Sequence, residues 1–188
     1  CVWQQRTEAI CFLDVGQGDG ILIRSPDGRN IVIDGGSTSQ SKCGTYTLLP
    51  ALRSQGMTEI DCWFVTHTDE DHISGLKELL LQGKLTQIKV RTVVFSAYVF
   101  QDAALAELEA VIRAAGITIV WMREGDVIGD DTFTLTCLHP TAEYRAKDKN
   151  AASLALAYHS DTFDMLFTGD MDADAVAAGV EKAHEEIS

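Results

Sequence analysis

The chain has few of the features that would place it in a membrane, in a disulfide-stabilised scaffold or among basic nucleic-acid-binding proteins. It contains no run of about eighteen apolar residues, so we expect no membrane-spanning helix in it. Its five cysteines are scattered and include no Cys-x-x-Cys pair, which argues against a structural zinc site or a disulfide framework. Only 15 Lys and Arg residues stand against 28 Asp and Glu residues, and the net charge of −13 argues against a general nucleic-acid-binding surface.

The composition of the chain is that of an ordinary globular protein. Of its 188 residues, 46% are hydrophobic and 23% are charged. Strand-like runs, the first at Ile10–Val15, alternate with helical patterns, the first at Thr45–Gln55, as far as Met122. A strand-rich section follows from Asp126 to Thr168. A final amphipathic helix is predicted for Asp172–Glu186. This order predicts a layered α/β fold, with a single domain spanning residues 1–188.

The strongest functional pattern is the block His67–His72, which reads His-Thr-Asp-Glu-Asp-His and directly follows the apolar run Cys62–Val65. A loop after a buried strand can aim several side chains at one point. Carboxylates gathered so closely repel one another unless a cation is bound between them. The block therefore favours a binuclear metal site over the alternative, a polar turn with chance histidines.

Two further candidate ligands also follow short strands. His139 comes after the alternating run Phe133–Leu138, and Asp170 comes just after the run Met165–Thr168. Taken singly, His139 is more often a polar residue at a strand end, and Asp170 could cap the next helix. Three strands that each end in candidate ligands are harder to obtain by chance, so we predict that they converge on one metal site.

These motifs resemble the metallo-β-lactamase superfamily, through the His-x-Asp-x-Asp-His block, the later Leu-His-Pro and the Thr-Gly-Asp. The stretches Phe12–Gly20, Ile33–Gly36 and Asn150–Ser153 narrow the resemblance to the hydrolase domain of the ComEC DNA-internalisation competence protein family. The resemblance covers nearly the whole chain, and it implies a metallo-β-lactamase-like αββα sandwich.

That family carries a further His in a His-His-Gly-Ser stretch, which does not occur before Ser188. We therefore expect a fragment whose C-terminal part, with the last metal-binding motif, is missing. Hydrolase activity is expected of the complete domain, whereas the fragment is expected to hold at most one metal well and to show little hydrolysis. The resemblance implies a larger parent protein in the bacterial plasma membrane. It also implies that this domain is a soluble, extracytoplasmic part of that protein.

The resemblance further implies which residues bind metal. Three loops at strand ends would supply the ligands of two divalent cations, Mn²⁺ or Zn²⁺: His67, Asp69 and His139 for the first, Asp71 and His72 for the second, and Asp170 as the bridge. Asp71 and Asp170 are also the expected catalytic residues. A carboxylate in place of the commoner His at position 69 suits Mn²⁺ better than an all-imidazole pocket would.

Four more residues are expected around this centre. Asp34 is expected to support the ligand loop through hydrogen bonds, and Asp19 to line the pocket or to cap a turn. Asn150 and Ser153 are expected either to orient a phosphate group or to form a turn. The basic run from Arg145 to Lys149 is interpreted either as a phosphate-binding rim or as a solvated loop.

The function implied is a metal-dependent phosphodiester hydrolase, a nuclease that acts on single-stranded DNA during DNA uptake. No nucleotide cofactor is expected, because no helix follows the glycines between Gly16 and Gly20 as a dinucleotide-binding loop would require. Two alternatives stay open. One is a non-catalytic docking domain of a DNA channel, and the other is a hydrolase of small esters or lactones on the same fold.

Overall fold

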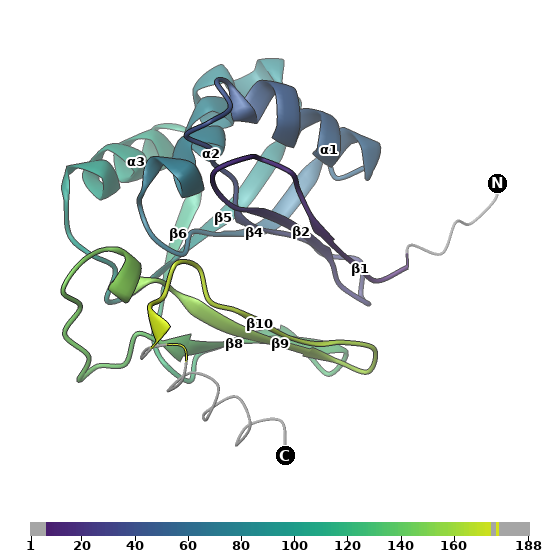
Figure 1. Cartoon of the computed structure of the whole chain (residues 1–188). Helices are drawn as coiled ribbons and strands as arrows, with labels where there is room; N and C mark the ends of the chain where they lie inside the picture. Colours follow the sequence, from purple (N-terminus) through teal and green to yellow (C-terminus); the bar gives the residue numbers. More distant parts are fainter. Residues whose placement is uncertain (1–6, 174–175, 177–188) are drawn as a thin grey trace.

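Two stacked β-sheets and a layer of helices form the part of the chain that the computed structural model describes, residues 7–173 and 176 (Figure 1). In the larger sheet the strands lie in the order β1-β2-β3-β4-β5-β6, with these bounds: β1 Ala9–Phe12, β2 Gly20–Arg24, β3 Asn30–Asp34, β4 Glu59–Phe64, β5 Lys89–Ser96 and β6 Thr118–Met122. The smaller sheet has the order β10-β9-β8-β7, with these bounds: β7 Val127–Asp130, β8 Phe133–His139, β9 Ala155–Ser160 and β10 Asp164–Phe167. The predicted α/β class is confirmed.

Helices connect the strands that run parallel. The strands from β3 to β6 pair in parallel, whereas β1 to β3 and all four strands of the smaller sheet pair antiparallel. Each parallel pair needs a crossover, and the helical segments supply it: a π-helical turn at Gly44–Leu48 with α1 (Leu49–Ser54), then α2 (Glu70–Gln82) with a 3₁₀ turn at Gly83–Leu85, then α3 (Ala103–Ala114). The carboxyl ends of β3 and β4 thus meet at one edge of the sheet, which brings the segments after Asp34 and Phe64 together.

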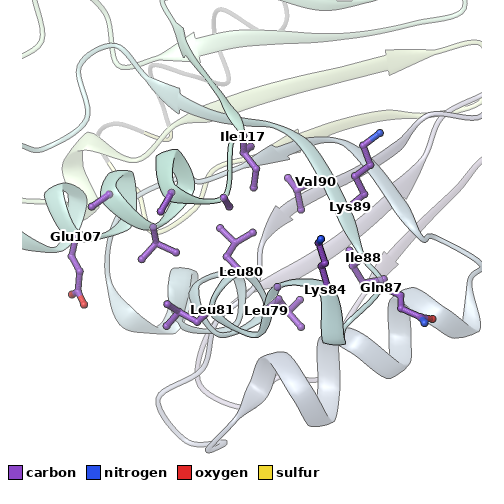
Figure 2. Close-up of a pocket in the computed structure, with 15 residues that line it drawn as sticks. Leu79, Leu80, Leu81, Lys84, Gln87, Ile88, Lys89, Val90, Glu107 and Ile117 are labelled. Carbon is purple, nitrogen blue, oxygen red and sulfur yellow. The ribbon is translucent and has the colours of Figure 1, made fainter.

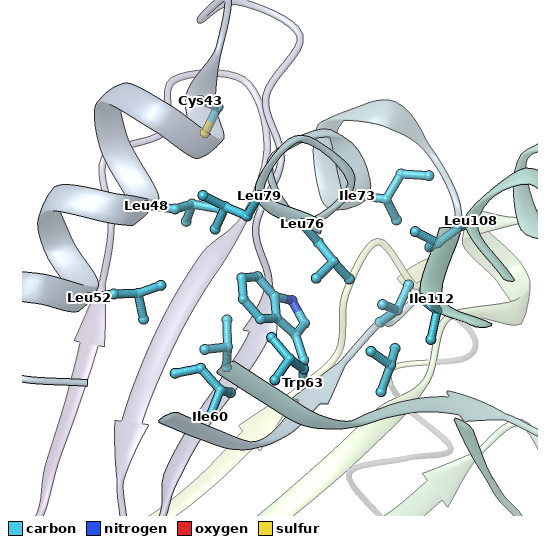
Figure 3. Close-up of a cluster of buried hydrophobic side chains, with 14 of the residues drawn as sticks. Cys43, Leu48, Leu52, Ile60, Trp63, Ile73, Leu76, Leu79, Leu108 and Ile112 are labelled. Carbon is cyan, nitrogen blue, oxygen red and sulfur yellow. The ribbon is translucent and has the colours of Figure 1, made fainter. Parts of the chain in front are cut away.

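Apolar side chains on the two faces of the larger sheet form two hydrophobic cores. On β2, Leu22 faces the helices while Ile23 faces the smaller sheet, and on β4 the same division separates Trp63 from Phe64. Trp63 is fully buried at the centre of the helix-side core, where Leu76 of α2 packs beside it (Figure 3). This core holds α2 against the sheet and therefore fixes where its first turn lies.

Two predicted elements differ from the structure, and a third lies largely outside the described residues. The strand expected as far as Val15 ends at Phe12, because the Val15 N–H donates a hydrogen bond to the Leu13 carbonyl and the chain turns into the glycine loop. The helix expected from Thr45 divides into the π-helical turn and α1. The helix predicted for Asp172–Glu186 lies largely outside the described residues, although Met171 and Val176 join an apolar cluster on the smaller sheet. None of the described helices is long and apolar enough to span a membrane.

A large apolar cavity lies at the C-terminal end of α2, opposite the end that carries His72. It has a volume of about 990 Å³ and opens between the C-terminal halves of α2 and α3, where aliphatic side chains such as Leu80, Val111 and Ile117 line it (Figure 2). The predicted ligands lie instead near the N-terminal end of α2. Among the described residues, this groove holds none of the His and carboxylate groups that could bind a metal.

Candidate metal centre

The loop after β4 and the first turn of α2 bring two imidazoles together, with their ring planes tilted by 49°. His67 lies three residues after β4, His72 lies in the first turn of α2, and their ring centroids are 4.0 Å apart. Both side chains are buried, with 1% exposure. Asp170, which follows β10, joins them in a group whose ligand atoms lie within 4.8 Å of one another. The sequence therefore predicted correctly that these two loops meet.

His72 is oriented by a buried carboxylate. Its Nδ1 lies 2.9 Å from Oδ2 of Asp34, and its Nε2 lies 3.3 Å from Oδ1 of Asp170. Asp34 also accepts hydrogen bonds from the backbone N–H of Thr66 at 2.8 Å and from its hydroxyl at 2.7 Å. Asp34 thus makes the kind of hydrogen bonds to the loop that the sequence suggested. With the Nδ1 proton directed at Asp34, Nε2 is the nitrogen left for a cation.

His67 is oriented in the same way as His72, with Nδ1 directed at protein groups and Nε2 left for a cation. Its Nδ1 lies 3.2 Å from the hydroxyl of Thr66 and 3.4 Å from that of Ser153. Its Nε2 is buried and has no hydrogen-bond partner among the described residues. A buried polar atom without a partner costs free energy unless something binds it. Together with the Nε2 of His72 and a carboxylate oxygen, it fits a divalent cation.

Carboxylates crowd around the two imidazoles. Burial raises the pKa of Asp19, and the negative charges of Asp34, Asp170 and Asp71 raise it further. Burial opposes the protonation of His72, but the hydrogen bond and charge of Asp34 outweigh it and raise its pKa to about 9. A cation-free site therefore keeps a proton on His72, which a cation would displace.

Glycines let the first loop approach the N-terminus of α2. Gly18 has a φ of +142°, and a Cβ there would meet the backbone oxygens of Asp71 and Gly36. A Cβ at Gly36 would lie 2.6 Å from the carbonyl oxygen of Glu70. The result is a polar cavity of about 260 Å³ with the following lining: Gly16, Gln17, Gly18, Asp19, Asp71, His72 and Asp170.

His139 lies apart from the His67, His72 and Asp170 group. It ends β8 and is buried, but its Nε2 lies 2.9 Å from the carbonyl oxygen of Ala151. Its ring packs edge-on with that of Tyr144, with the ring centroids 4.4 Å apart. Burial lowers the pKa of His139, and Nε2 is the donor because a carbonyl oxygen can only accept. Its assignment as a ligand stays a prediction.

Asp69 and the basic run Arg145–Lys149 are involved in ion pairs and hydrogen bonds within the protein. Oδ2 of Asp69 lies 3.7 Å from Nε2 of His67, whereas Oδ1 is paired with Lys149 at 2.8 Å. Lys147 pairs with Asp172, and Arg145 donates to backbone carbonyls of its own loop. Each cation of this run therefore has a partner within the protein, and its role as a phosphate-binding rim stays a prediction.

The sequence analysis did not predict Thr66 as a site residue, and the structure shows the contacts of Asn150 and Ser153. Thr66 immediately precedes the ligand block, so its position was the available signal for its contacts with Asp34 and His67. Asn150 begins a 3₁₀ turn that ends before Ser153, and its carbonyl accepts a hydrogen bond from the Ser153 N–H. Asn150 thus lies in a turn, and the hydroxyl of Ser153 lies 3.4 Å from Nδ1 of His67. A role of either residue in orienting a phosphate stays a prediction. His159 is exposed and paired with Asp164, as expected of a surface residue.

Comparisons with known proteins agree on the fold. A family model described as the Metallo-beta-lactamase superfamily matches residues 13–142. ComE operon protein 3 of Bacillus subtilis (strain 168) is 30% identical over 176 residues, which cover 87% of this chain and only 22% of that protein.

Two solved structures share the architecture. The metallo-beta-lactamase fold protein YhfI from Bacillus subtilis matches 81% of this chain and 55% of its own, with a TM-score of 0.54 and 14% identity. A HARLDQ-motif mutant of a metallo-beta-lactamase from Cronobacter sakazakii matches 98% of this chain and 72% of its own, with a TM-score of 0.54 and 13% identity. Identities this low establish the fold alone.

Proposed function

Because this chain belongs to the metallo-beta-lactamase superfamily, whose members are typically metal-dependent hydrolases, we propose that it hydrolyses phosphodiesters and that its substrate is a DNA strand. The observation that carries the proposal is the unpartnered, buried Nε2 of His67 in the group that it forms with His72 and Asp170. A divalent cation held there would neutralise charge on the phosphate and lower the pKa of the attacking water.

The surrounding residues prepare this chemistry. Asp34 holds the proton of His72 on Nδ1, so that Nε2 stays directed at the cavity. Thr66 and Ser153 place hydroxyl groups at Nδ1 of His67 and restrict the rotation of that ring. Asp71 and Asp170 line the cavity, and we propose them as the further cation ligands that the chemistry requires.

The size of the cavity favours a backbone phosphate as the reacting group. At about 260 Å³ it is smaller than the roughly 300–1,000 Å³ of a typical small-molecule site. The described residues that line it are carboxylates, an imidazole, glycines and Gln17, and they include no Phe, Tyr or Trp ring on which a base could stack. We propose that the site engages one phosphodiester group at a time and reads no base sequence.

The choice of DNA is supported by the similarity to ComE operon protein 3 and by the resemblance to the ComEC competence family. A cation-loaded site would offset part of the net charge of −13, which otherwise repels a polyanion. We propose Mn²⁺ as the more effective activating ion and Zn²⁺ as the competitor, since at least half of the proposed ligands are carboxylates.

The proposal is tested on the complete metallo-β-lactamase domain, which is incubated with labelled single-stranded DNA and, separately, with a simple aryl ester. Each substrate is assayed with Mn²⁺, with Zn²⁺ and with chelator. We expect metal-dependent cleavage of DNA and none of the ester. The matched controls are His67→Ala, which removes a proposed ligand, and His159→Gln, which removes an exposed histidine outside the site.

Two outcomes would contradict the proposal. Hydrolysis of the ester without cleavage of DNA would favour an esterase. Cation binding without hydrolysis of either substrate would favour a docking domain.

A further inference from the structure

Lys149 is bound between two carboxylates at the border of the metal centre. Its ammonium lies 2.8 Å from Oδ1 of Asp69 and 2.8 Å from Oδ2 of Asp102. The Lys149 side chain is only 27% exposed. Asp69 and Lys149 are 80 residues apart in the chain, so the fold itself builds this contact.

Asp102 anchors the lysine. Its other oxygen, Oδ1, accepts a hydrogen bond of 2.9 Å from the backbone N–H of Leu105 and so caps the N-terminus of α3. The hydroxyl of Thr68 lies 3.4 Å from the same oxygen. Since Asp102 is fixed by the helix, Lys149 is held in one place, and its positive charge remains beside Asp69.

One oxygen of Asp69, Oδ1, is thereby occupied by the lysine, while the other stays near the His67 ring. Its Oδ2 lies 3.7 Å from Nε2 of His67, which is too long for a hydrogen bond, and Asp69 makes no capping hydrogen bond to α2 although it occupies the N-cap position. Its closest charged partner is the lysine.

We propose that Lys149 is a built-in competitor for Asp69 that sets the cation affinity of this centre. The lysine neutralises the carboxylate, so the cation is held by His67, His72 and Asp170 without a full contribution from Asp69. This inference rests on the proposed metal site. Two effects act in the same direction, because a cation that recruits Asp69 must break its ion pair and must also approach a fixed ammonium group.

The test is a calorimetric titration of Mn²⁺ into the wild-type chain and four variants, with a thermal melt of each to confirm folding. Lys149→Met removes the charge, and Lys149→Arg keeps it. Lys147→Met is the matched control, because Lys147 lies in the same loop but pairs with Asp172 and is 69% exposed. The double variant Lys149→Met with Asp69→Asn shows whether the effect acts through Asp69.

We expect Lys149→Met to bind Mn²⁺ at least about tenfold more tightly than the wild type, since one close charge is removed from a partly buried site. Lys149→Arg and Lys147→Met should bind as the wild type does. The gain should vanish in the double variant.

Unchanged or weaker binding by Lys149→Met would overturn the inference while leaving the metal site intact. The same holds for a gain that persists without the Asp69 carboxylate, since it would then reflect charge alone. If neither the wild type nor Lys149→Met binds Mn²⁺, the proposed function itself fails, and this inference with it.

Discussion

Replacing Asp34 by Asn removes one buried negative charge from the metal centre and leaves the side chain's size unchanged. Asp34 has a φ of +55°, a backbone conformation that Asn adopts as readily as Asp, so the substitution adds no backbone strain. The amide oxygen can still accept the Thr66 N–H, but the amide NH₂ group would meet the Nδ1 proton of His72. His72 is then expected to move its proton to Nε2, the nitrogen that faces Asp170.

The magnitude follows from these contacts. A hydrogen bond to a charged group contributes about 1.5–3 kcal/mol, and loss of a residue that orients a metal ligand lowers metal affinity by about 10–100-fold. We expect Asp34→Asn to lower the affinity for Mn²⁺ or Zn²⁺ within that range. The pKa of His72, about 9 beside Asp34, should fall in the cation-free variant.

That change in pKa also gives a dependence of stability on pH. Because the folded-state pKa of His72 lies above the roughly 6.5 of an unfolded histidine, its pairing with Asp34 stabilises the cation-free protein fully at acidic pH. The contribution is lost as the pH rises from about 6.5 through about 9. Asp34→Asn should remove this loss.

Two assays test this prediction. One is calorimetric titration of the cation, and the other is denaturant unfolding of the apo protein between about pH 6 and about pH 10, a range that spans the unfolded and folded pKa values of His72. Asp61→Asn is the matched control, because Asp61 accepts a backbone N–H of Asn30 at 2.9 Å but lies outside the centre. Asp34→Asn with wild-type cation affinity and an unchanged His72 titration would refute the reasoning.

Three further predictions can be checked on the same protein. Gly18→Ala should disrupt cation binding, because its Cβ would meet the backbone of Asp71. Gly28→Ala is the control, since Gly28 is also at positive φ but a Cβ there would have no atom within 4 Å, and it should affect stability alone. Cation titration and thermal melts separate the two effects. His67→Ala and Asp71→Asn should abolish DNA cleavage and leave the apo fold intact by circular dichroism; near-wild-type cleavage by either would rule out that ligand. Leu76→Ala, in the core beside Trp63, should lower the free energy of unfolding by about 2–5 kcal/mol, and a loss below about 1 kcal/mol would contradict its place there.

The sequence predicted what local patterns determine. The apolar runs before His67, His139 and Asp170 were strands, and the block between β4 and α2 brought His67 and His72 together, because residues next to a strand end must lie at the edge of the sheet. The division of the chain into a parallel section with helices and an antiparallel section also followed from the periodicity.

What the sequence did not show are the side-chain contacts between distant segments. The pairing of Lys149 with Asp69 depends on how the loop before β9 lies against α3, and nothing in the local pattern around either residue indicates it. The hydrogen bond from His139 to the carbonyl of Ala151 depends in the same way on the 3₁₀ turn at Asn150–Ala152. Motif spacing predicts which loops converge, but the hydrogen bonds that compete for each ligand are set only when the layers pack.

The central claim is that a divalent cation binds between His67, His72 and Asp170. The most direct test is a crystal structure of the chain soaked with Mn²⁺, with anomalous scattering measured at the manganese edge. The account predicts an anomalous peak within coordination distance of both Nε2 atoms and of the Asp170 carboxylate. A peak elsewhere, or no peak at a concentration that saturates binding in solution, would contradict it.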